Sequence, residues 1–333
     1  MVSNNKILIT GAAGFIGFHL SNFFLANNLK VTGIDCMNEY YDIDLKNSRL
    51  AILQRNNDFT FKKIDICDKM SLDKLFEEEK FDIVINLAAQ AGVRYSIEQP
   101  YKYIDSNLIG FINILEACRS FPVKHLFFAS SSSVYGSNKK IPFSVSDQTD
   151  SPVSLYAATK KANELMAYSY AHLYNIPMTG LRFFTVYGPW GRPDMAYFSF
   201  TKNIVNDEPI KLYNEGKMRR DFTYIDDVVK GIYSLLEHLS QSSFKWNSEE
   251  QIKIFNIGNN QPVELIHFVE TLQNIIGKKA TIEMLPMQDG DVVETYADID
   301  PLKKLTGFSP KTNIQEGLQQ FFDWYKMYNK INF

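Results

Sequence analysis

Three glycines near the N-terminus constrain the fold of this 333-residue chain more than any other feature. They lie in the run GAAGFIG at residues 11–17, between the apolar run KILIT at 6–10 and a helical pattern. In this context Gly11 permits a tight turn, Gly14 lets the backbone approach a diphosphate, and Gly17 lets the helix pack closely on the strand. The helix N-terminus would direct its N–H groups at the phosphates. The run therefore predicts a strand–turn–helix unit that binds a dinucleotide.

An acidic residue follows at a suitable distance. Asp35 ends the second apolar run, 18 residues after Gly17, where its carboxylate can accept hydrogen bonds from the hydroxyls of an adenosine ribose. The same charge repels a 2′-phosphate, so the pattern favours NAD over NADP. An aspartate that merely caps a turn is the structural alternative.

The N-terminal half alternates short apolar runs with helical patterns. Strands are expected at residues 6–10, 30–35, 59–65, 81–87, 125–130 and 177–183, and helices at 15–27, 70–79, 103–119 and 156–174. Right-handed βαβ units then predict an α/β fold with a doubly wound Rossmann parallel sheet.

Beyond residue 184 the segments are shorter and more mixed, and the run IKIFNI at 252–257 is expected to rejoin the first sheet. We therefore expect a Rossmann domain of residues 1–183, with returning segments near 222–260. A smaller, discontinuous α/β domain for substrate would comprise residues 184–221 and 261–333.

Composition excludes several classes of protein. The 35 basic and 38 acidic residues give a net charge of −3, which argues against binding to nucleic acid or to an anionic membrane. No run approaches the roughly 18 apolar residues of a membrane span, and no signal peptide is recognisable. The three cysteines (Cys36, Cys67 and Cys118) are too few and too scattered for a disulfide framework or a zinc site. We expect a cytoplasmic protein without a metal.

Tyr156 and Lys160 lie four residues apart in a predicted helix and therefore share one face. A nearby ammonium favours the phenolate and lowers the tyrosine pKa, which suits proton transfer from a sugar hydroxyl. A surface tyrosine beside a solvated lysine is the alternative. The same spacing occurs in two loop sequences, where it fixes no geometry (Tyr135/Lys139 and Tyr213/Lys217).

Four serines at residues 130–133 follow the fifth predicted strand. Ligands of parallel sheets bind beyond the carboxyl ends of the strands, so a hydroxyl there can bond to a substrate oxygen and to Tyr156. A polar strand end satisfied by backbone groups is the alternative.

These features, with Asp65-Ile66 and the run NLAA at 86–89, occur in an order that resembles the extended short-chain dehydrogenase/reductases, a family of nucleotide-sugar epimerases, dehydratases and decarboxylases. The resemblance covers essentially the whole chain. It implies a tightly held NAD and a homodimer whose helices around 103–119 and 156–174 form a four-helix bundle. It implies NAD contacts at Gly11, Ala13, Gly14, Phe15, Ile16, Gly17, Asp35, Asp65, Ile66, Leu87, Ala88, Ala89, Asn107, Tyr156 and Lys160.

Four longer motifs narrow the resemblance to the UDP-glucuronate 4-epimerases of that family: AGVRYS at 91–96, LRFFTVYGPWGRPDM at 181–195, GKMRRDFTYIDDV at 216–228 and PMQDGDV at 286–292. The implied reaction inverts C4 of UDP-glucuronate through a 4-keto sugar, without net redox, to give UDP-galacturonate. Tyr156, Ser131 and Lys160 would be catalytic. Contacts with the UDP-sugar are implied at Arg94, Ser131, Ser132, Ser133, Tyr156, Thr185, Arg192, Arg220, Gln288 and Asp291.

Within these contacts, we expect Ser132, Ser133 and Thr185 at the sugar carboxylate. Arg220 is expected at the diphosphate and Arg192 on the nucleotide side. Gln288 stands where other epimerases have an arginine, so whether this position contacts the diphosphate is left open. Aromatic residues are frequent in this chain, and some of them gather at Phe183, Phe184, Tyr187 and Trp190. We expect these four to form a wall between the sugar and its nucleotide.

The serine triplet also separates the alternatives. Related dehydratases have TDEVYG and decarboxylases TSEVYG, whereas this chain has no carboxylate before Val134, and elimination of water needs an extra acid and base. Sister enzymes for neutral sugars have Asn in place of Thr185. A 4-epimerase for UDP-glucose or UDP-N-acetylglucosamine is the first alternative and a UDP-glucuronate decarboxylase the second. A non-catalytic NAD sensor would not need Tyr156, Lys160 and Ser131 together.

Overall fold

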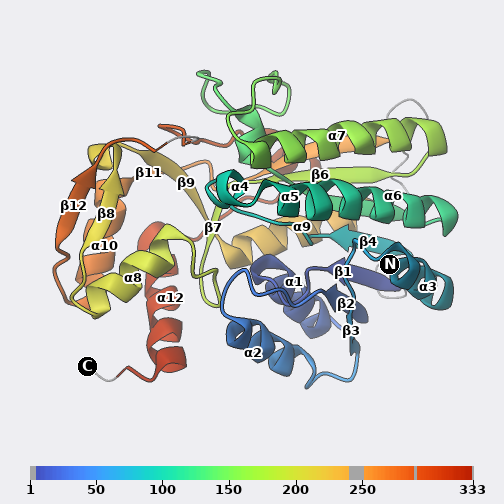
Figure 1. Cartoon of the computed structure of the whole chain (residues 1–333), viewed down its shortest axis with the longest axis horizontal. Helices are drawn as coiled ribbons and strands as arrows, with labels where there is room; N and C mark the ends of the chain where they lie inside the picture. The colour runs from blue at the N-terminus through green and yellow to red at the C-terminus, as the bar shows by residue number, and fades with distance from the viewer. Residues whose placement is uncertain (1–4, 240–250, 289–290, 332–333) are drawn as a thin grey trace.

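A computed structural model describes residues 5–239, 251–288 and 291–331 of the chain. Within these ranges seven parallel strands form a central sheet (Figure 1), which confirms the predicted fold class. Across the sheet the strands are β10 (Ile252–Ile257), β6 (Met178–Phe183), β5 (His125–Ser131), β4 (Ile83–Asn86), β1 (Ile7–Thr10), β2 (Val31–Asp35) and β3 (Phe59–Lys63). Phe255 of β10 lies opposite Leu181 of β6, so the run at 252–257 does rejoin the first sheet.

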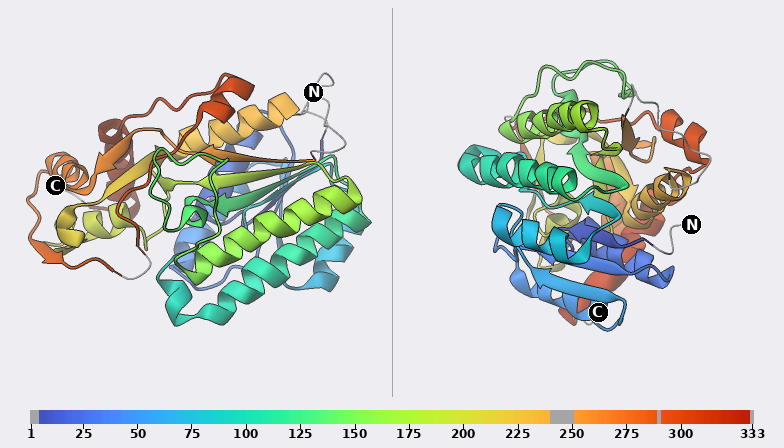
Figure 2. Two further views of the ribbon diagram at one scale, coloured as in Figure 1. Left: turned by 90° about the horizontal axis from the view of Figure 1, so that it is seen from above. Right: turned by 90° about the vertical axis from the view of Figure 1, so that its right-hand side faces the viewer.

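Helices cover both faces of this sheet (Figure 2). On one face, α3 (Lys69–Glu79), α6 (Gly110–Ser120) and α7 (Leu155–Tyr174) share a buried core with Leu8 and Phe128 of the strands. On the other, α1 (Phe15–Ala26) and α9 (Ile225–Leu239) share a second core with Ile7 and Phe127. Side chains of one strand alternate between the faces, so each strand contributes to both cores. This double burial explains the nearly continuous apolar runs in the sequence.

The predicted helix over residues 103–119 is interrupted. It comprises α5 (Pro100–Tyr103), a π-helical turn η2 (Ile104–Ile109) and α6, and the short α4 (Tyr95–Glu98) precedes it. Such wide turns occur mostly inside α-helices and often near functional sites. Here the turn carries Asn107, which is buried.

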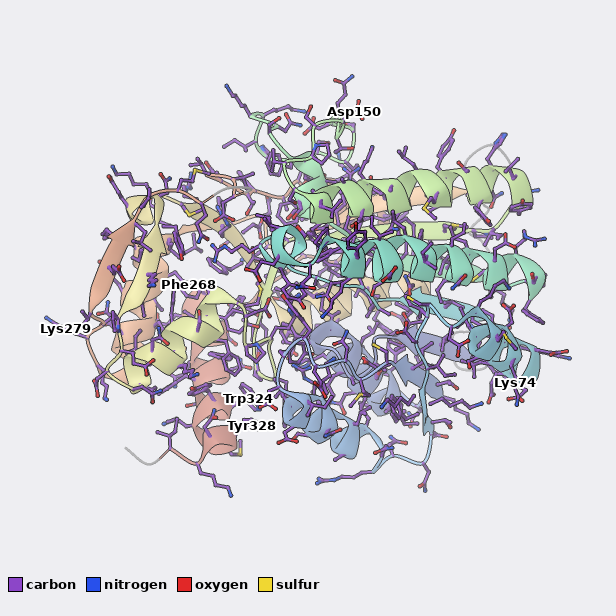
Figure 3. The ribbon with its side chains drawn as sticks, viewed as in Figure 1. Lys74, Asp150, Phe268, Lys279, Trp324 and Tyr328 are labelled. Atoms are coloured by element: carbon purple, nitrogen blue, oxygen red, sulfur yellow. The ribbon has the colours of Figure 1, made fainter. Side chains whose placement is uncertain are left out.

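A smaller group of elements lies beside the carboxyl ends of the central strands. Among the described residues, β7 (Thr185–Tyr187), β9 (Arg219–Tyr224) and β11 (Pro262–Glu264) form one sheet, and β8 (Ile210–Tyr213) pairs with β12 (Ile282–Leu285). The helices α8 (Ala196–Val205), α10 (Leu265–Ile276) and α12 (Ile314–Asn329) pack around them. Phe268 of α10, labelled in Figure 3, lies in this group. Its ring stacks on that of Phe222 of β9, with centroids 4.5 Å apart.

The division into two domains stays a prediction, and part of its boundary region, residues 240–250, lies outside the described residues. The helix α11 (Asp300–Thr306) falls in the range expected for the second domain, yet it packs on α9 and β10. One hydrophobic core also joins α1 and α9 to α10 and α12. In the described ranges, no helix combines the length and the apolar character that crossing a bilayer requires.

Candidate active site

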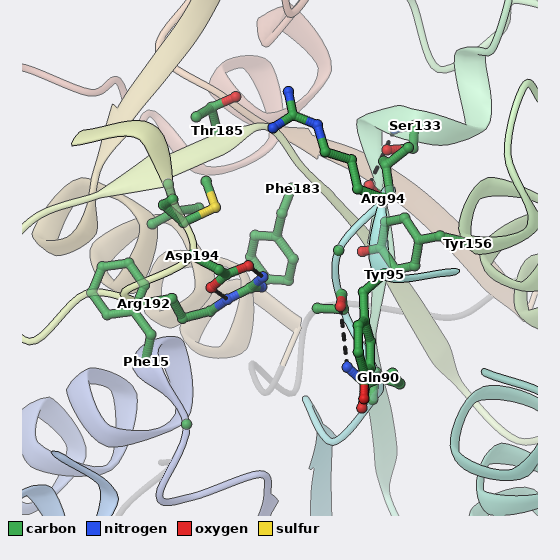
Figure 4. Close-up of a pocket in the computed structure, with 18 of the residues that line it drawn as sticks. Phe15, Gln90, Arg94, Tyr95, Ser133, Tyr156, Phe183, Thr185, Arg192 and Asp194 are labelled. Carbon is green, nitrogen blue, oxygen red and sulfur yellow. Dashed lines mark hydrogen bonds and ion pairs between the residues drawn. The ribbon is translucent and has the colours of Figure 1, made fainter. Parts of the chain in front are cut away.

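A pocket of about 1010 Å³ opens where the central strands end, and residues of the smaller group of elements form its other wall (Figure 4). Gly11, Leu87 and Ser131 line it from the ends of β1, β4 and β5. Tyr213 and Arg220 line it from β8 and β9. The pocket therefore lies where ligands of doubly wound sheets bind.

The glycine loop forms one end of the pocket. Gly11 has a φ of +70°, and the N–H of Gly14 donates to its carbonyl oxygen at 2.9 Å. A Cβ atom on Gly17 would lie 2.1 Å from the same oxygen, so a side chain there is incompatible with this packing. No side chain caps the N-terminus of α1, which leaves its first N–H groups facing the pocket for a phosphate.

Asp35 is held at the edge of this loop. Its Oδ2 accepts from the N–H of Ala13 at 3.2 Å and its Oδ1 from the N–H of Met37 at 2.8 Å, and the side chain lines the pocket. Ala13 does not line the pocket. Its carbonyl oxygen accepts from Nη1 of Arg49 at 2.8 Å, so Ala13 anchors the loop.

The remaining residues expected at the cofactor divide into two groups. Phe15, Ile16, Asp65, Ile66, Leu87, Ala88 and Ala89 line the pocket. Asn107 does not. Its Oδ1 accepts from the N–H of Gln90 at 2.8 Å and its Nδ2 donates to the carbonyl of Gln90 at 3.0 Å. Asn107 therefore fixes the pocket-lining loop after β4.

Together these residues fit NAD. A glycine cradle too narrow for side chains lies at an uncapped helix N-terminus, and a carboxylate stands at the end of the neighbouring strand. No cluster of three His, Cys, Asp or Glu side chains that could hold a metal ion occurs within the ranges described.

Tyr156 opens the first turn of α7, whose N-terminus is capped by the hydroxyl of Ser154 accepting from the N–H of Ala157 at 3.1 Å. Burial raises the pKa of Tyr156, while a hydrogen bond with Ser131 and the charge of Arg192 lower it. The ring of Tyr103 packs edge-on against that of Tyr156, with centroids 6.1 Å apart. Tyr156 is therefore held between β5, α5 and the loop that carries Arg192.

Lys160 lies one turn further along α7. Its Nζ donates to the carbonyl oxygen of Ala129 at 2.9 Å, and burial lowers the pKa of its ammonium to about 8. The sequence predicts that Lys160 lowers the pKa of Tyr156. In the structure the cation that lowers the pKa of Tyr156 is Arg192. The other two spaced pairs do not lie on one helix: Tyr135 ends a 3₁₀ turn and Tyr213 ends β8.

Neutral hydroxyls line the pocket beside Ser131. Ser132 and Ser133 open the 3₁₀ turn η3 (Ser132–Tyr135), and Thr185 opens β7. The N–H of Ser133 donates to the Oγ of Ser131 at 3.1 Å, which closes the turn against the strand end. These groups offer hydrogen bonds without adding charge.

Arg192 forms a cluster with two residues that the sequence did not single out. Its guanidinium pairs with the carboxylate of Asp194, and the hydroxyl of Tyr40 donates to the same carboxylate at 3.1 Å. All three line the pocket. The motif GRPDM contains Asp194, but Tyr40 has no sequence signal because it lies in an irregular loop over 150 residues away.

Arg94 and Asp291 pair with each other across the pocket, Nη2 to Oδ2 at 3.2 Å, and Arg94 lies over the ring of Tyr213. Arg220 donates to the carbonyl of Val293 at 3.0 Å; burial lowers the pKa of its guanidinium and Asp291 opposes this effect. Gln288 does not line the pocket. Its two successors, positions 289 and 290 of the motif PMQDGDV, lie outside the described residues.

The expected aromatic wall is half correct. Phe183 and Phe184 line the pocket, but Tyr187 and Trp190 do not. Trp190 packs against Trp324 of α12 with centroids 5.2 Å apart, and Tyr187 donates to the carbonyl of Asn313 at 3.3 Å. The expectation is wrong for these two because Tyr187, at the end of β7, and Trp190, in the loop that follows, both pack against α12 and its N-cap.

Comparison with known proteins agrees with this geometry. The sequence profile described as the NAD dependent epimerase/dehydratase family matches residues 7–258. Protein CapI of Staphylococcus aureus is 53% identical, with 98% of this chain and 99% of that protein covered. A probable UDP-glucuronate 4-epimerase of Rhizobium meliloti (strain 1021) is 49% identical, with 96% of each covered. The crystal structure of UDP-glucuronic acid 4-epimerase from Bacillus cereus, in complex with UDP-glucuronic acid and NAD, superposes with a TM-score of 0.89 at 34% identity, covering 97% of this chain and 99% of that one.

Proposed function

The chain belongs to the NAD dependent epimerase/dehydratase family, and on that premise we propose that it interconverts UDP-glucuronate and UDP-galacturonate by inverting C4 of the sugar. One observation carries the choice of substrate: the pocket that holds Tyr156 and Ser131 is also lined by neutral hydroxyls, those of Ser132 and Ser133 directly after Ser131 and that of Thr185 at the start of β7. Such groups can hold a carboxylate without acting as an acid on it. The relatives named as UDP-glucuronate 4-epimerases support the same substrate.

The proton at O4 is moved by Tyr156. As a phenolate it accepts the hydroxyl proton of C4, and Ser131 donates a hydrogen bond to O4 or to the phenolate. NAD, when bound, would supply the redox chemistry as a reversible hydride acceptor, and inversion requires that the 4-keto sugar turn over in the site before the hydride returns to C4. Lys160 would exchange its bond to the carbonyl of Ala129 for the nicotinamide ribose and would place positive charge beside Tyr156.

A 4-keto uronate is a β-keto acid and can lose CO₂. The chain offers the sugar carboxylate the hydroxyls of Ser132, Ser133 and Thr185, and no carboxylate precedes Val134 in the serine turn. Decarboxylation is suppressed when the breaking C–C bond stays out of alignment with the carbonyl π system. We propose that these three hydroxyls hold the carboxylate in such an orientation.

The diphosphate would be bound by arginines of the opposite wall. Arg220 and Arg94 both line the pocket near Asp291, and a guanidinium matches the geometry of phosphate oxygens. A ligand with two phosphates would compete with Asp291 for Arg94. Arg192 we assign to the sugar side of the nucleotide, because its charge acts on Tyr156.

We further propose a homodimer that pairs α6 and α7 with their copies in a four-helix bundle. The two helices lie side by side at the surface (Figure 2). Exposed apolar side chains gather there: Leu165, Tyr168 and Leu173 on α7 are 57%, 62% and 64% exposed. Large exposed apolar patches on a protein of this kind mark interaction surfaces.

We place the enzyme in the cytoplasm, where NAD and UDP-sugars are available, and its cysteines are free thiols. Its product is an activated uronic acid. The reaction class that consumes such a product is glycosyl transfer into an acidic polysaccharide.

The proposal is tested by incubating the purified protein with each UDP-sugar, without added NAD, and following the products by proton NMR. UDP-galacturonate from UDP-glucuronate supports it. Formation of UDP-xylose with CO₂ would refute the proposal and show a decarboxylase. Turnover of UDP-glucose or UDP-N-acetylglucosamine alone would refute it and show a 4-epimerase for neutral sugars. The variant Tyr156→Phe should lose turnover and keep its NAD; near-normal rates would refute the assigned base.

A further inference from the structure

Behind the pocket lies a buried ion pair that the proposed mechanism does not use. Glu164 of α7 and Arg182 of β6 are each about 3% exposed at their side chains. Two parallel hydrogen bonds join them, from Nε to Oε1 at 2.8 Å and from Nη2 to Oε2 at 2.9 Å. Neither residue lines the pocket.

A third residue completes the network from the neighbouring strand. The hydroxyl of Ser130, in β5, donates to Oε1 of Glu164 at 2.6 Å. Ser130 and Arg182 lie opposite each other in the register of β5 and β6, so their side chains point to the same face of the sheet. Glu164 thus ties α7 to two central strands at once.

Glu164 of this network lies on the same face of α7 as Tyr156 and Lys160. Tyr156, Lys160 and Glu164 follow one another at intervals of four residues and form one stripe along α7. Each contacts one of three consecutive residues of β5: Tyr156 contacts Ser131, Lys160 the carbonyl of Ala129, and Glu164 the hydroxyl of Ser130. A shift of α7 along β5 that separated Tyr156 from Ser131 would therefore also break the bonds of Glu164.

Arg182 extends the network to the serine turn. Its guanidinium lies over the ring of Tyr135, 4.8 Å from the centroid, and the hydroxyl of Tyr135 donates to Oδ1 of Asn256 at 2.6 Å. Tyr135 ends the turn η3 that begins with Ser132. The same guanidinium therefore supports α7 from one side and the serine turn from the other.

A buried ion pair is weak support for stability, because the cost of removing two charges from water offsets their attraction, and apolar replacements of similar volume are often as stable. A role in geometry accounts better for this pair. On the premise of the proposed function, we propose that Glu164, Arg182 and Ser130 are positioning residues, which fix α7 and the serine turn on β5 so that Ser131 stays within hydrogen-bonding distance of Tyr156.

Two variants test this in the NAD-bound enzyme. Ser130→Ala removes only the bond to β5, and the double variant Glu164→Leu/Arg182→Met replaces the ion pair by an apolar pair of similar volume. Ser234→Ala is the matched control, since that hydroxyl of α9 donates within its own helix at 2.8 Å. A misplacement of about 1 Å can cost about a hundredfold in rate, so we expect kcat to fall at least tenfold in both test variants, with the KM for UDP-glucuronate within about twofold.

The second measurement does not depend on substrate. The phenolate of Tyr156 is titrated by ultraviolet difference absorbance between each protein and its Tyr156→Phe counterpart. Tyr156 faces Ser131 from β5, Arg192 from the loop before α8, Tyr103 from α5 and Lys160 on its own helix. The hydrogen bond with Ser131 lowers the pKa of Tyr156. We expect the test variants to weaken this bond, so the pKa of Tyr156 should rise and the titration should move to higher pH.

The outcomes are distinct. A raised titration midpoint together with a lower kcat supports positioning. A lower melting temperature with an unchanged midpoint and an unchanged kcat would show a structural role alone and overturn the inference. If the wild type converts no UDP-uronate, the proposed function fails, but the titration still decides whether the three residues position Tyr156.

Discussion

The guanidinium of Arg192 forms two hydrogen bonds with the carboxylate of Asp194, from Nε to Oδ1 at 3.0 Å and from Nη2 to Oδ2 at 2.5 Å. The charge of Arg192 lowers the pKa of Tyr156, so Asp194 partly neutralises the charge that favours the phenolate. We therefore propose that the pair controls how strongly Tyr156 is activated at a given pH.

Removing the counterion should shift the pH dependence of catalysis. In Asp194→Asn the charge of Arg192 is no longer neutralised, which lowers the pKa of Tyr156 further. In the proposed mechanism the phenolate is the active form, so the acidic limb of the kcat profile should move to lower pH by about one unit. The profile is measured with UDP-glucuronate. Asp207→Asn is the control, since Asp207 does not line the pocket and pairs with Lys278 instead. An unchanged limb, or a shift to higher pH, would contradict this role.

Lys160 should lower the stability of the cofactor-free protein. Burial lowers its pKa from 10.5 to about 8, so between these values the unfolded chain holds the proton and the folded chain does not. The free energy of unfolding then rises with pH across this window, and below it the unfavourable contribution is constant. Lys160→Met should abolish that rise and stabilise the free protein near neutral pH by about 1–3 kcal/mol, while turnover falls at least about a hundredfold.

This prediction is checked by urea unfolding at about pH 7.5 and about pH 9.5. The control is Lys74→Met on the exposed side of α3 (Figure 3). If the free energy of unfolding rises equally in the wild type and in Lys160→Met between the two pH values, Lys160 does not titrate in this window.

The glycine cradle should tolerate no side chain at residue 17. In Gly17→Ala the new Cβ would lie 2.1 Å from the carbonyl oxygen of Gly11, so the loop and the N-terminus of α1 must move apart. We expect loss of bound NAD and a free energy of unfolding lower by about 2–4 kcal/mol. NAD released on denaturation is quantified by chromatography. Gly231→Ala in α9, away from the pocket, should keep its NAD; full NAD occupancy in Gly17→Ala would contradict the cradle.

The dimer should depend on the outer face of α7. Leu165→Glu places a charge in the proposed bundle, where its desolvation opposes association, so the variant should sediment as a monomer at micromolar concentration. Met70→Glu, at an 85% exposed position of α3, is the control and should leave the dimer intact. A wild type that sediments as a monomer would rule out the dimer, and a dimeric Leu165→Glu would exclude this face.

The parts of the fold that the sequence predicts depend on short-range patterns. The strand, the glycine loop and α1 are contiguous, and Tyr156 and Lys160 share one helix, so their relation needs no knowledge of the tertiary structure. By contrast α2 (Ile43–Leu53) has no apolar periodicity, because its inner face carries Lys46 and Arg49, which are 4% and 0% exposed. A helix that buries charged side chains has no hydrophobic pattern from which it could be recognised.

The site residues that the sequence does not place depend on contacts between distant segments. Tyr40 meets Asp194, and Arg94 meets Asp291, at separations of 154 and 197 residues. Asn107 illustrates the same limit: the family resemblance implies a cofactor contact there, and in the structure the amide of Asn107 in the π turn is hydrogen-bonded to Gln90. Such pairings follow from how the two walls of the pocket meet, and local sequence contains no signal for them.

We propose that one site inverts C4 by removing a hydride and returning the same hydride. The most direct measurement uses UDP-glucuronate labelled with deuterium at C4, in ordinary water and without added NAD, followed by NMR and mass spectrometry. We predict UDP-galacturonate that retains the deuterium at C4, because the hydride never leaves the site. Loss of the label to solvent, or formation of UDP-xylose with CO₂, would rule out this mechanism.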